Sequence, residues 1–189
     1  PITITRDGAD GRFSWLVVLG LFMAVSWVAN KWAQSETSIG MQYLGLGIYV
    51  VAQAVLLVPL LYVAQYFAQD ANLISTAAII TGALFAGLTA VVFITRKDFS
   101  FLGGFLAVAG FALLGTIAAS MIFGFSLGLL FTGCGIAFAG LYIVYDTSNI
   151  LHHYRTTQHV AASLALFASV ALLFWYVLQL LMSLSSNRD

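Results

Sequence analysis

One carboxylate stands out in this sequence because it lies at the end of a long apolar segment. Asp146 falls in the stretch 141–155, where hydrophobic periodicity places it inside or beside a membrane-spanning helix. Charged side chains are expensive within a bilayer, and such a residue is a functional candidate by default. Asp146 is therefore predicted to take up a proton or bind a cation. The alternative is a residue at a helix end that forms a salt bridge with Arg155 or Lys31 at the membrane interface.

Three histidines follow this carboxylate: His152, His153 and His159. A zinc site needs three or four converging ligands, whereas adjacent residues on a helix point about 100° apart. Neither a second cysteine nor a suitably spaced acidic residue is available to complete a site. The spacing therefore favours a solvated loop at the membrane interface, and we expect neither a metal nor a cofactor.

Enzymatic activity is not expected from the motifs in this chain. The sequence lacks the H-E-x-x-H pattern of zinc proteases, the G-x-S-x-G pattern of hydrolases and a phosphate-binding P-loop. The membrane-spanning segments also do not supply the two carboxylates that an intramembrane aspartyl protease would need.

The composition places these residues in a membrane protein. Of the 189 residues, 61% are hydrophobic and 7% are charged, whereas soluble domains carry about 25% charged residues. Seven basic and seven acidic side chains cancel, and no basic run suggests nucleic acid. The lipid bilayer is the predicted partner of this surface.

Apolar segments of the required length predict an all-α, polytopic transmembrane helical bundle. A hydrocarbon core of roughly 30 Å needs about 20 residues of helix. Six segments qualify: 13–33, 43–67, 73–95, 101–123, 127–151 and 160–184. The polar residues 1–12 are expected to be extended or loosely ordered, and 185–189 form a short polar tail. The gaps between spans are too short to fold independently, so residues 13–184 are predicted to form a single bundle.

The basic residues predict how this bundle is oriented. One side of the membrane receives Lys31, Arg96, Lys97 and Arg155, and the other receives Arg6, Arg12 and Arg188. The positive-inside rule makes the first side cytoplasmic.

Small residues and one proline mark possible helix contacts and a possible hinge. Gly135 and Ala139, like Gly133 and Ala137, have the spacing that lets helix backbones approach closely in lipid. The helix over 127–151 is therefore predicted to be the central one. Pro59 predicts a kink within 43–67, with a gating hinge as the alternative reading.

Two segments resemble the signatures of a known family. Residues 95–105, with the sequence TRKDFSFLGGF, and residues 145–152, with the sequence YDTSNILH, are similar to motifs of the Bax inhibitor-1/YccA family, also called the transmembrane Bax inhibitor motif family. The order of the hydrophobic spans matches as well. The resemblance extends well over 76–184 and loosely over the first two helices.

This resemblance implies a seven-helix fold with a cytoplasmic N-terminus, and hence that the first family helix is missing from the chain, which begins at Pro1. It also implies a bacterial inner-membrane protein. The loops with Arg96-Lys97 and His152-Arg155 would be cytoplasmic, in agreement with the charge distribution.

The resemblance further implies a site and two possible partners. Family members are implicated in pH-sensitive calcium leak, and the YccA branch in restraining the membrane protease FtsH. The leak depends on two aspartates of the last two helices, which share a proton or a cation. The first matches Asp146, whereas the position of the second is occupied by Ser169. A serine can donate a hydrogen bond but cannot carry the second charge.

Two functions of different classes follow as expectations. The first is a pH-influenced cation leak channel, with calcium as the ion, Asp146 and Ser169 at its site, and Lys31 or Arg155 as a latch. The alternative is a non-conducting regulatory or structural subunit of a membrane complex, such as a modulator of an FtsH-type protease. A small-solute transporter is a weaker expectation, because paired broken helices are not evident in the sequence.

Overall fold

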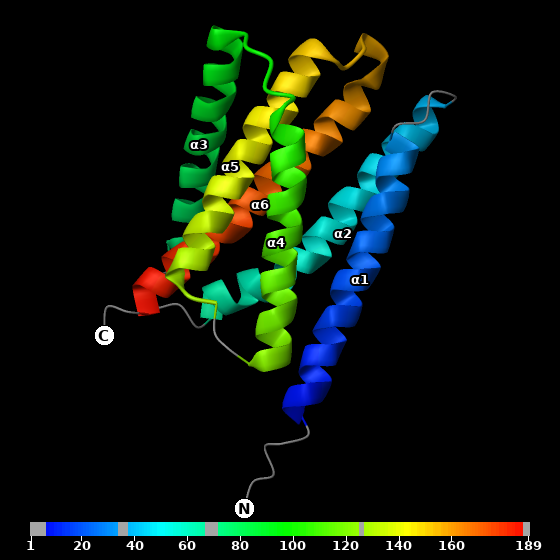
Figure 1. The fold of residues 1–189 in the computed structure, drawn as a ribbon. Helices are drawn as coiled ribbons and strands as arrows, with labels where there is room; N and C mark the ends of the chain where they lie inside the picture. The colour runs from blue at the N-terminus through cyan, green and yellow to red at the C-terminus, as the bar shows by residue number, and fades with distance from the viewer. Residues whose placement is uncertain (1–6, 34–37, 67–71, 125–126, 187–189) are drawn as a thin grey trace, which may run out of the picture. The chain divides into compact units, whose positions relative to one another are not determined.

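In the computed structural model, residues 7–33, 38–66, 72–124 and 127–186 are described, and all regular structure in these ranges is helical (Figure 1). The six α-helices and one short 3₁₀ helix are α1 (Asp7–Ala33), α2 (Ile39–Tyr66), α3 (Leu73–Thr95), α4 (Leu102–Phe123), α5 (Leu129–His152), η1 (Thr156–Gln158) and α6 (His159–Ser186). The all-α fold class is confirmed.

The helix bounds follow the predicted spans closely, with the main difference at the start of α1. This helix begins at Asp7, so residues 7–12, which we expected to be extended or loosely ordered, are helical instead. Hydropathy reports which residues can lie in lipid, whereas a nucleated helix propagates into polar sequence at little cost. Residues 1–6 and most of the polar tail, 187–189, lie outside the described residues.

Five of these helices, α2 to α6, are long and apolar enough to cross a membrane. Their large side chains face outward to an extent that water would not tolerate: Ile94 is 81% exposed, Phe111 78% and Leu130 83%. Each helix satisfies its own backbone hydrogen bonds, as a lipid environment demands. These features fit an integral membrane protein, and the span 13–33 within α1 stays a prediction.

The described residues fall into two compact units, divided between Leu56 and Leu57 within α2. Each unit is described by itself below, and the single bundle over 13–184 stays a prediction. Helix α2 continues through Pro59 without a break.

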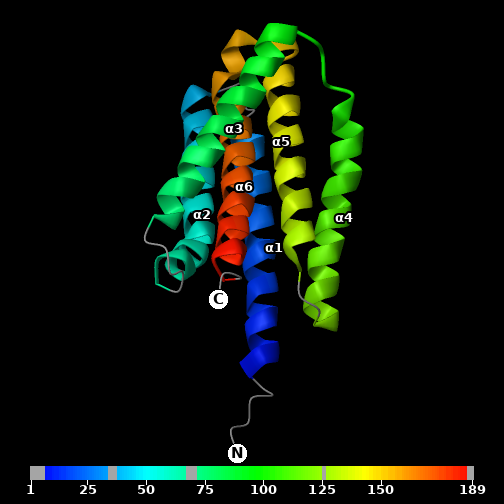
Figure 2. The same cartoon turned by 90° about the vertical axis from the view of Figure 1, so that its left-hand side faces the viewer.

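In the second unit, α5 packs against α3, α4 and α6, and α3 also packs against α6. Helices α5 and α6 lie side by side in both views (Figures 1 and 2). The helix predicted to be central therefore does contact three others, and it shares the centre of this unit with α6. The core contains Leu73 and Ala77 of α3, Ala139 and Ile143 of α5, and Leu173, Val177 and Leu178 of α6.

A glycine decides how closely α5 and α6 approach. A Cβ atom added to Gly135 would overlap the ring of Tyr176, which is 6% exposed. Ala139, one turn further along α5, is fully buried. Gly133 and Ala137 are exposed, and nothing lies within 4 Å of a Cβ added to Gly133. Of the two predicted small-residue pairs, only that of Gly135 packs against another helix.

In the first unit, α1 packs closely along the first part of α2. A Cβ added to Gly45 would come within 2.6 Å of the carbonyl oxygen of Ala29, so the two backbones meet at this point. Ala29 and Ala33 are buried, and the rings of Phe22 and Tyr49 lie 6.0 Å apart. Small residues thus hold these two helices together.

Candidate functional site

Asp146 lies near one end of α5. The helix ends at His152, so a rise of 1.5 Å per residue places Asp146 about 9 Å from that end. Asp146 is 7% exposed, and Thr147 and Ser148 after it are also buried. Because three successive residues point in three directions around a helix, this part of α5 is enclosed on several sides. Asp146 therefore does not snorkel freely into water.

Ser169 of α6 is the side chain that the structure brings to Asp146. Its hydroxyl lies near the Asp146 carboxyl group, and Ser169 is itself 2% exposed. By distance and angle, this hydroxyl donates to two carbonyl oxygens of its own helix, those of Leu166 at 3.1 Å and Ala165 at 3.3 Å. Among the described residues, Oδ2 of Asp146 has no hydrogen-bond partner. A buried carboxylate oxygen in this state is unusual and calls for an explanation.

The two predicted latch residues are placed differently. Arg155 is exposed after the end of α5, its backbone N–H donates to Oε1 of Gln158 at 3.0 Å, and within the described ranges no ion pair joins it to Asp146. Lys31 belongs to the first unit, where its ammonium group lies 5.3 Å from the ring centre of Trp27. A pairing of Lys31 with Asp146 stays a prediction.

The turn between α3 and α4 is fixed to the end of α5 by side chains, and we call this contact the polar junction. It comprises residues 96–100 of the turn together with Ser148, His152 and His153 of α5. Ser148 is fully buried. Its hydroxyl accepts a hydrogen bond from the backbone N–H of Phe99 at 2.8 Å and donates to the carbonyl oxygen of Lys97 at 3.5 Å. One serine thus satisfies two backbone groups of the turn.

The histidines and Asp98 complete the polar junction. Nδ1 of His152 lies 2.9 Å from the carbonyl oxygen of Ser148, and Nε2 lies 3.2 Å from that of Arg96. Nε2 of His153 lies 3.6 Å from a carboxylate oxygen of Asp98. The backbone N–H of Ser100 donates to Asp98 at 2.9 Å. This hydrogen bond lowers the pKa of Asp98 most, and the positive charges of His153 and His152 lower the pKa further.

The histidines are exposed, as a solvated location requires. The prediction of a simple loop is nevertheless wrong for His152, the last residue of α5, and for His159, the first residue of α6. Sequence reasoning also missed Ser148, because a serine within an apolar helix gives no sign of a partner 49 residues away. The available signal was the family resemblance, since both signature segments contribute to the polar junction.

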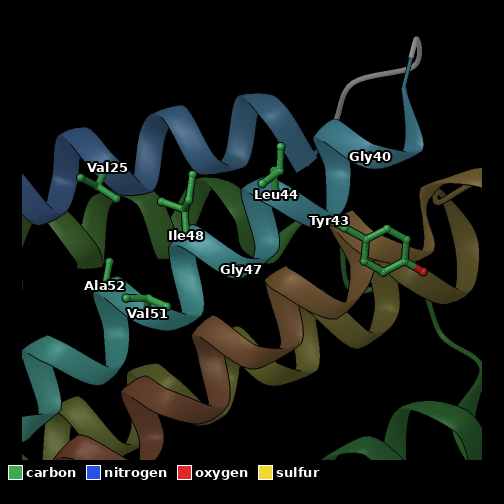
Figure 3. A pocket seen from close by; sticks show the side chains of 8 residues that line it. All are labelled: Val25, Gly40, Tyr43, Leu44, Gly47, Ile48, Val51 and Ala52. Carbon is green, nitrogen blue, oxygen red and sulfur yellow. The ribbon is translucent and has the colours of Figure 1, made fainter.

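An apolar groove in the first unit is lined almost entirely by residues without polar side chains (Figure 3). Its volume is about 620 Å³, and α1 contributes Val25 to its lining. The remaining lining residues all belong to α2: Gly40, Tyr43, Leu44, Gly47, Ile48, Val51 and Ala52. Tyr43 alone among them has a polar side chain. Reactive groups therefore gather around Asp146 and the polar junction rather than here.

Comparison with known proteins decides the family. A model of the family described as "Inhibitor of apoptosis-promoting Bax1" matches residues 3–187. The chain belongs to the Bax inhibitor-1 family. Bax inhibitor 1 of Schizosaccharomyces pombe is 38% identical over 126 residues, which are 64% of this chain and 46% of the yeast protein.

Two other relatives extend the comparison. An uncharacterized protein of Neisseria meningitidis serogroup A is 28% identical over 172 residues, 90% of this chain and 74% of the relative. The Golgi anti-apoptotic protein of Vaccinia virus (strain Lister) is 30% identical over 114 residues, 59% of this chain and 48% of the viral protein. The chain thus spans about half the length of the yeast and viral relatives. The predicted family membership is confirmed.

Proposed function

We propose that this Bax inhibitor-1 family protein is a non-enzymatic cation leak channel, with calcium as its ion and Asp146 as its ion-binding residue. The observation that carries the proposal is the buried Oδ2 atom of Asp146, which has no hydrogen-bond partner among the described residues. Calcium prefers carboxylate and other oxygen ligands. An intramembrane carboxylate with an unpaired oxygen is suited to bind a cation or a proton in passing.

Ser169 supports the further proposal that gating by pH is altered. Two close carboxylates cannot both ionise cheaply, so a carboxylate pair responds strongly to pH. Ser169 contributes a hydroxyl in place of a second carboxylate, and that hydroxyl donates to the carbonyl oxygens of Ala165 and Leu166. We therefore propose a weak, single-carboxylate site, whose low affinity favours leak over retention because an ion must leave as readily as it enters.

Calcium flux into proteoliposomes at pH 6 and pH 8 tests this proposal. Asp146→Asn retains the size of the side chain and removes its charge, so we expect flux to fall about ten-fold or more and to lose its dependence on pH. Asp98→Asn is the matched control, because Asp98 is an exposed carboxylate at the polar junction, and its flux should stay within about two-fold of wild type. Absence of flux at both pH values, or equal flux in wild type and Asp146→Asn, would refute the leak.

The alternative is a non-conducting regulatory or structural subunit, such as a modulator of an FtsH-type protease. The exposure of α4 favours this alternative. Only 6% of the most apolar 18-residue stretch of α4 is buried inside the protein, and within the second unit α4 packs against α5. A helix held on one side leaves most of its surface for lipid or for another membrane protein. Gentle extraction followed by size determination and mass spectrometry tests this, and a monodisperse monomer without co-purifying protein would argue against it.

A further inference from the structure

The ring of His152 lies between two hydrogen-bond acceptors. Nδ1 lies 2.9 Å from the carbonyl oxygen of Ser148 on α5, and Nε2 lies 3.2 Å from the carbonyl oxygen of Arg96 at the end of α3. A carbonyl oxygen can only accept, and a neutral imidazole carries one N–H. Only the protonated ring donates to both oxygens. In the neutral ring, one nitrogen lone pair would face a carbonyl oxygen.

Both acceptors belong to the ends of helices. His152 is the last residue of α5, and Arg96 is the C-cap of α3, where it adopts the left-handed conformation with φ of 50°. The last carbonyl groups of a helix lack partners within the helix and carry its partial negative charge, which favours a cation beside them. Two helix C-termini therefore meet at the His152 ring, and each favours a positive charge there.

Other charged and titratable groups lie on the segments that meet at this ring. From the α3–α4 turn come Arg96, Lys97 and Asp98, from α5 Asp146 and His153, and from the segment that follows Tyr154, Arg155 and His159. The three basic side chains oppose a further positive charge but are exposed, so water screens them. Asp98 favours a positive charge and also lies 3.6 Å from Nε2 of His153. Burial raises the pKa of Tyr154, so this phenol stays uncharged near neutral pH.

We propose that His152 is a protonation-dependent clamp that ties the end of α3 to the end of α5. When the ring is protonated, it donates to Ser148 and Arg96 together and holds the α3–α4 turn against α5. When it is neutral, its single N–H donates to only one of the two oxygens, so the ring no longer bonds both helix ends together. Histidine is the side chain that ordinarily changes charge between pH 5 and 8, so pH is the variable that tests the clamp. It acts on the turn and is independent of ion binding at Asp146.

Backbone hydrogen exchange of the turn, measured by mass spectrometry on the full chain in phospholipid nanodiscs, tests the clamp. The reporter is a peptide that covers residues 96–101, compared between wild type and variants at the same pH so that intrinsic exchange cancels. The side chain of His152→Gln does not titrate, and its single amide nitrogen cannot take the positions of both ring nitrogens. We expect exchange in this variant to be about five-fold faster than in wild type at pH 6, the effect of losing one hydrogen bond that water partly replaces. At pH 8 the exchange rates of the variant and of wild type should agree within about two-fold.

His153→Gln is the matched control, because His153 is exposed and contacts Asp98, and within the described part of the chain its ring bridges no carbonyl groups. Hydrogen exchange of residues 96–101 in this variant should match that of wild type at both pH 6 and pH 8. Equal exchange in wild type and His152→Gln at pH 6, or loss of the pH difference in His153→Gln instead, would overturn the proposal.

A second measurement decides the matter if His152→Gln does not fold. In wild-type protein with ¹⁵N-labelled histidine, nuclear magnetic resonance at pH 6 should show hydrogen-bonded protons on both ring nitrogens of one histidine. A single protonated nitrogen on every histidine at pH 6, while the turn remains protected from exchange, would overturn the clamp.

Discussion

At the scale of residues, the candidate site combines one buried carboxylate with one buried hydroxyl. The structure brings Ser169 of α6 to Asp146 of α5, and one carboxylate oxygen remains without a hydrogen bond from the described residues. A hydroxyl that donates to its own helix is a weak partner for a buried charge. The pair therefore carries one charge at most, and adding a second charge is the most direct way to alter it.

Ser169→Asp is predicted to increase both the affinity for calcium and the steepness of the pH response. Two unit charges of opposite sign at 4 Å interact by about 4 kcal/mol at an effective dielectric constant of 20, and desolvation of the new carboxylate offsets most of this gain. We expect about ten-fold lower half-saturating calcium at pH 8 in a proteoliposome flux assay. Ser169→Asn, which adds similar bulk without charge, is the control. The same affinity in both variants would contradict a role for charge at this position.

At the scale of elements, α5 organises the second unit. One of its faces packs on α6 through Gly135, and its last turn holds the α3–α4 turn through Ser148. The packed face and the polar junction are separate features, so they can be disturbed separately. Gly135 is the position where a single added carbon has most consequence.

Gly135→Ala is predicted to destabilise the second unit by about 1–3 kcal/mol, the usual effect of overpacking a well-filled core. The new methyl group would overlap the ring of Tyr176, which has little room to move because it is 6% exposed. Gly133→Ala, on the same helix, has nothing within 4 Å of the new methyl group and should be neutral or slightly stabilising. Unfolding in detergent, followed by circular dichroism, should rank the two variants in this order, and equal stability would contradict the packing argument.

The sequence predicts the helices better than it predicts their contacts. The span 73–95 coincides with α3 because the limits of lipid burial and of the helix agree there. At Asp7 they do not, since a helix can extend into water. The pairing of Asp146 with Ser169 was available through the family resemblance. The contacts of Ser148 and His152 with the turn were not, because they depend on how three helix ends meet, and hydropathy does not encode that arrangement.

At the scale of the whole molecule, the polar junction fixes which ends of the helices share one side of the membrane. His152 contacts the carbonyl oxygen of Arg96, so the end of α3 and the end of α5 lie together. The connection between α5 and α6 follows directly, and Arg155 lies in it. Lys97 and Arg155 must therefore face the same compartment, which the positive-inside rule predicts to be the cytoplasm.

Labelling of single cysteines with a membrane-impermeant maleimide tests this topology. Cys134 is exposed and is first replaced by serine. Lys97→Cys and Arg155→Cys should then react only from the cytoplasmic side, whereas Gly128→Cys, at the opposite end of α5, should react only from the other side. Labelling of the first two positions from opposite sides would contradict the fold. Labelling of both from outside would contradict the orientation.

The polar junction also has a consequence for the order of events during synthesis. The backbone groups of the α3–α4 turn find their partners on Ser148 and His152, which follow 49 to 56 residues later. At roughly 5–20 residues per second, the ribosome needs about 2 to 11 seconds to make that stretch. During this time, water must satisfy the turn, because buried backbone groups require partners. Until the end of α5 has been synthesised, the turn between α3 and α4 therefore lacks its hydrogen bonds to Ser148 and His152.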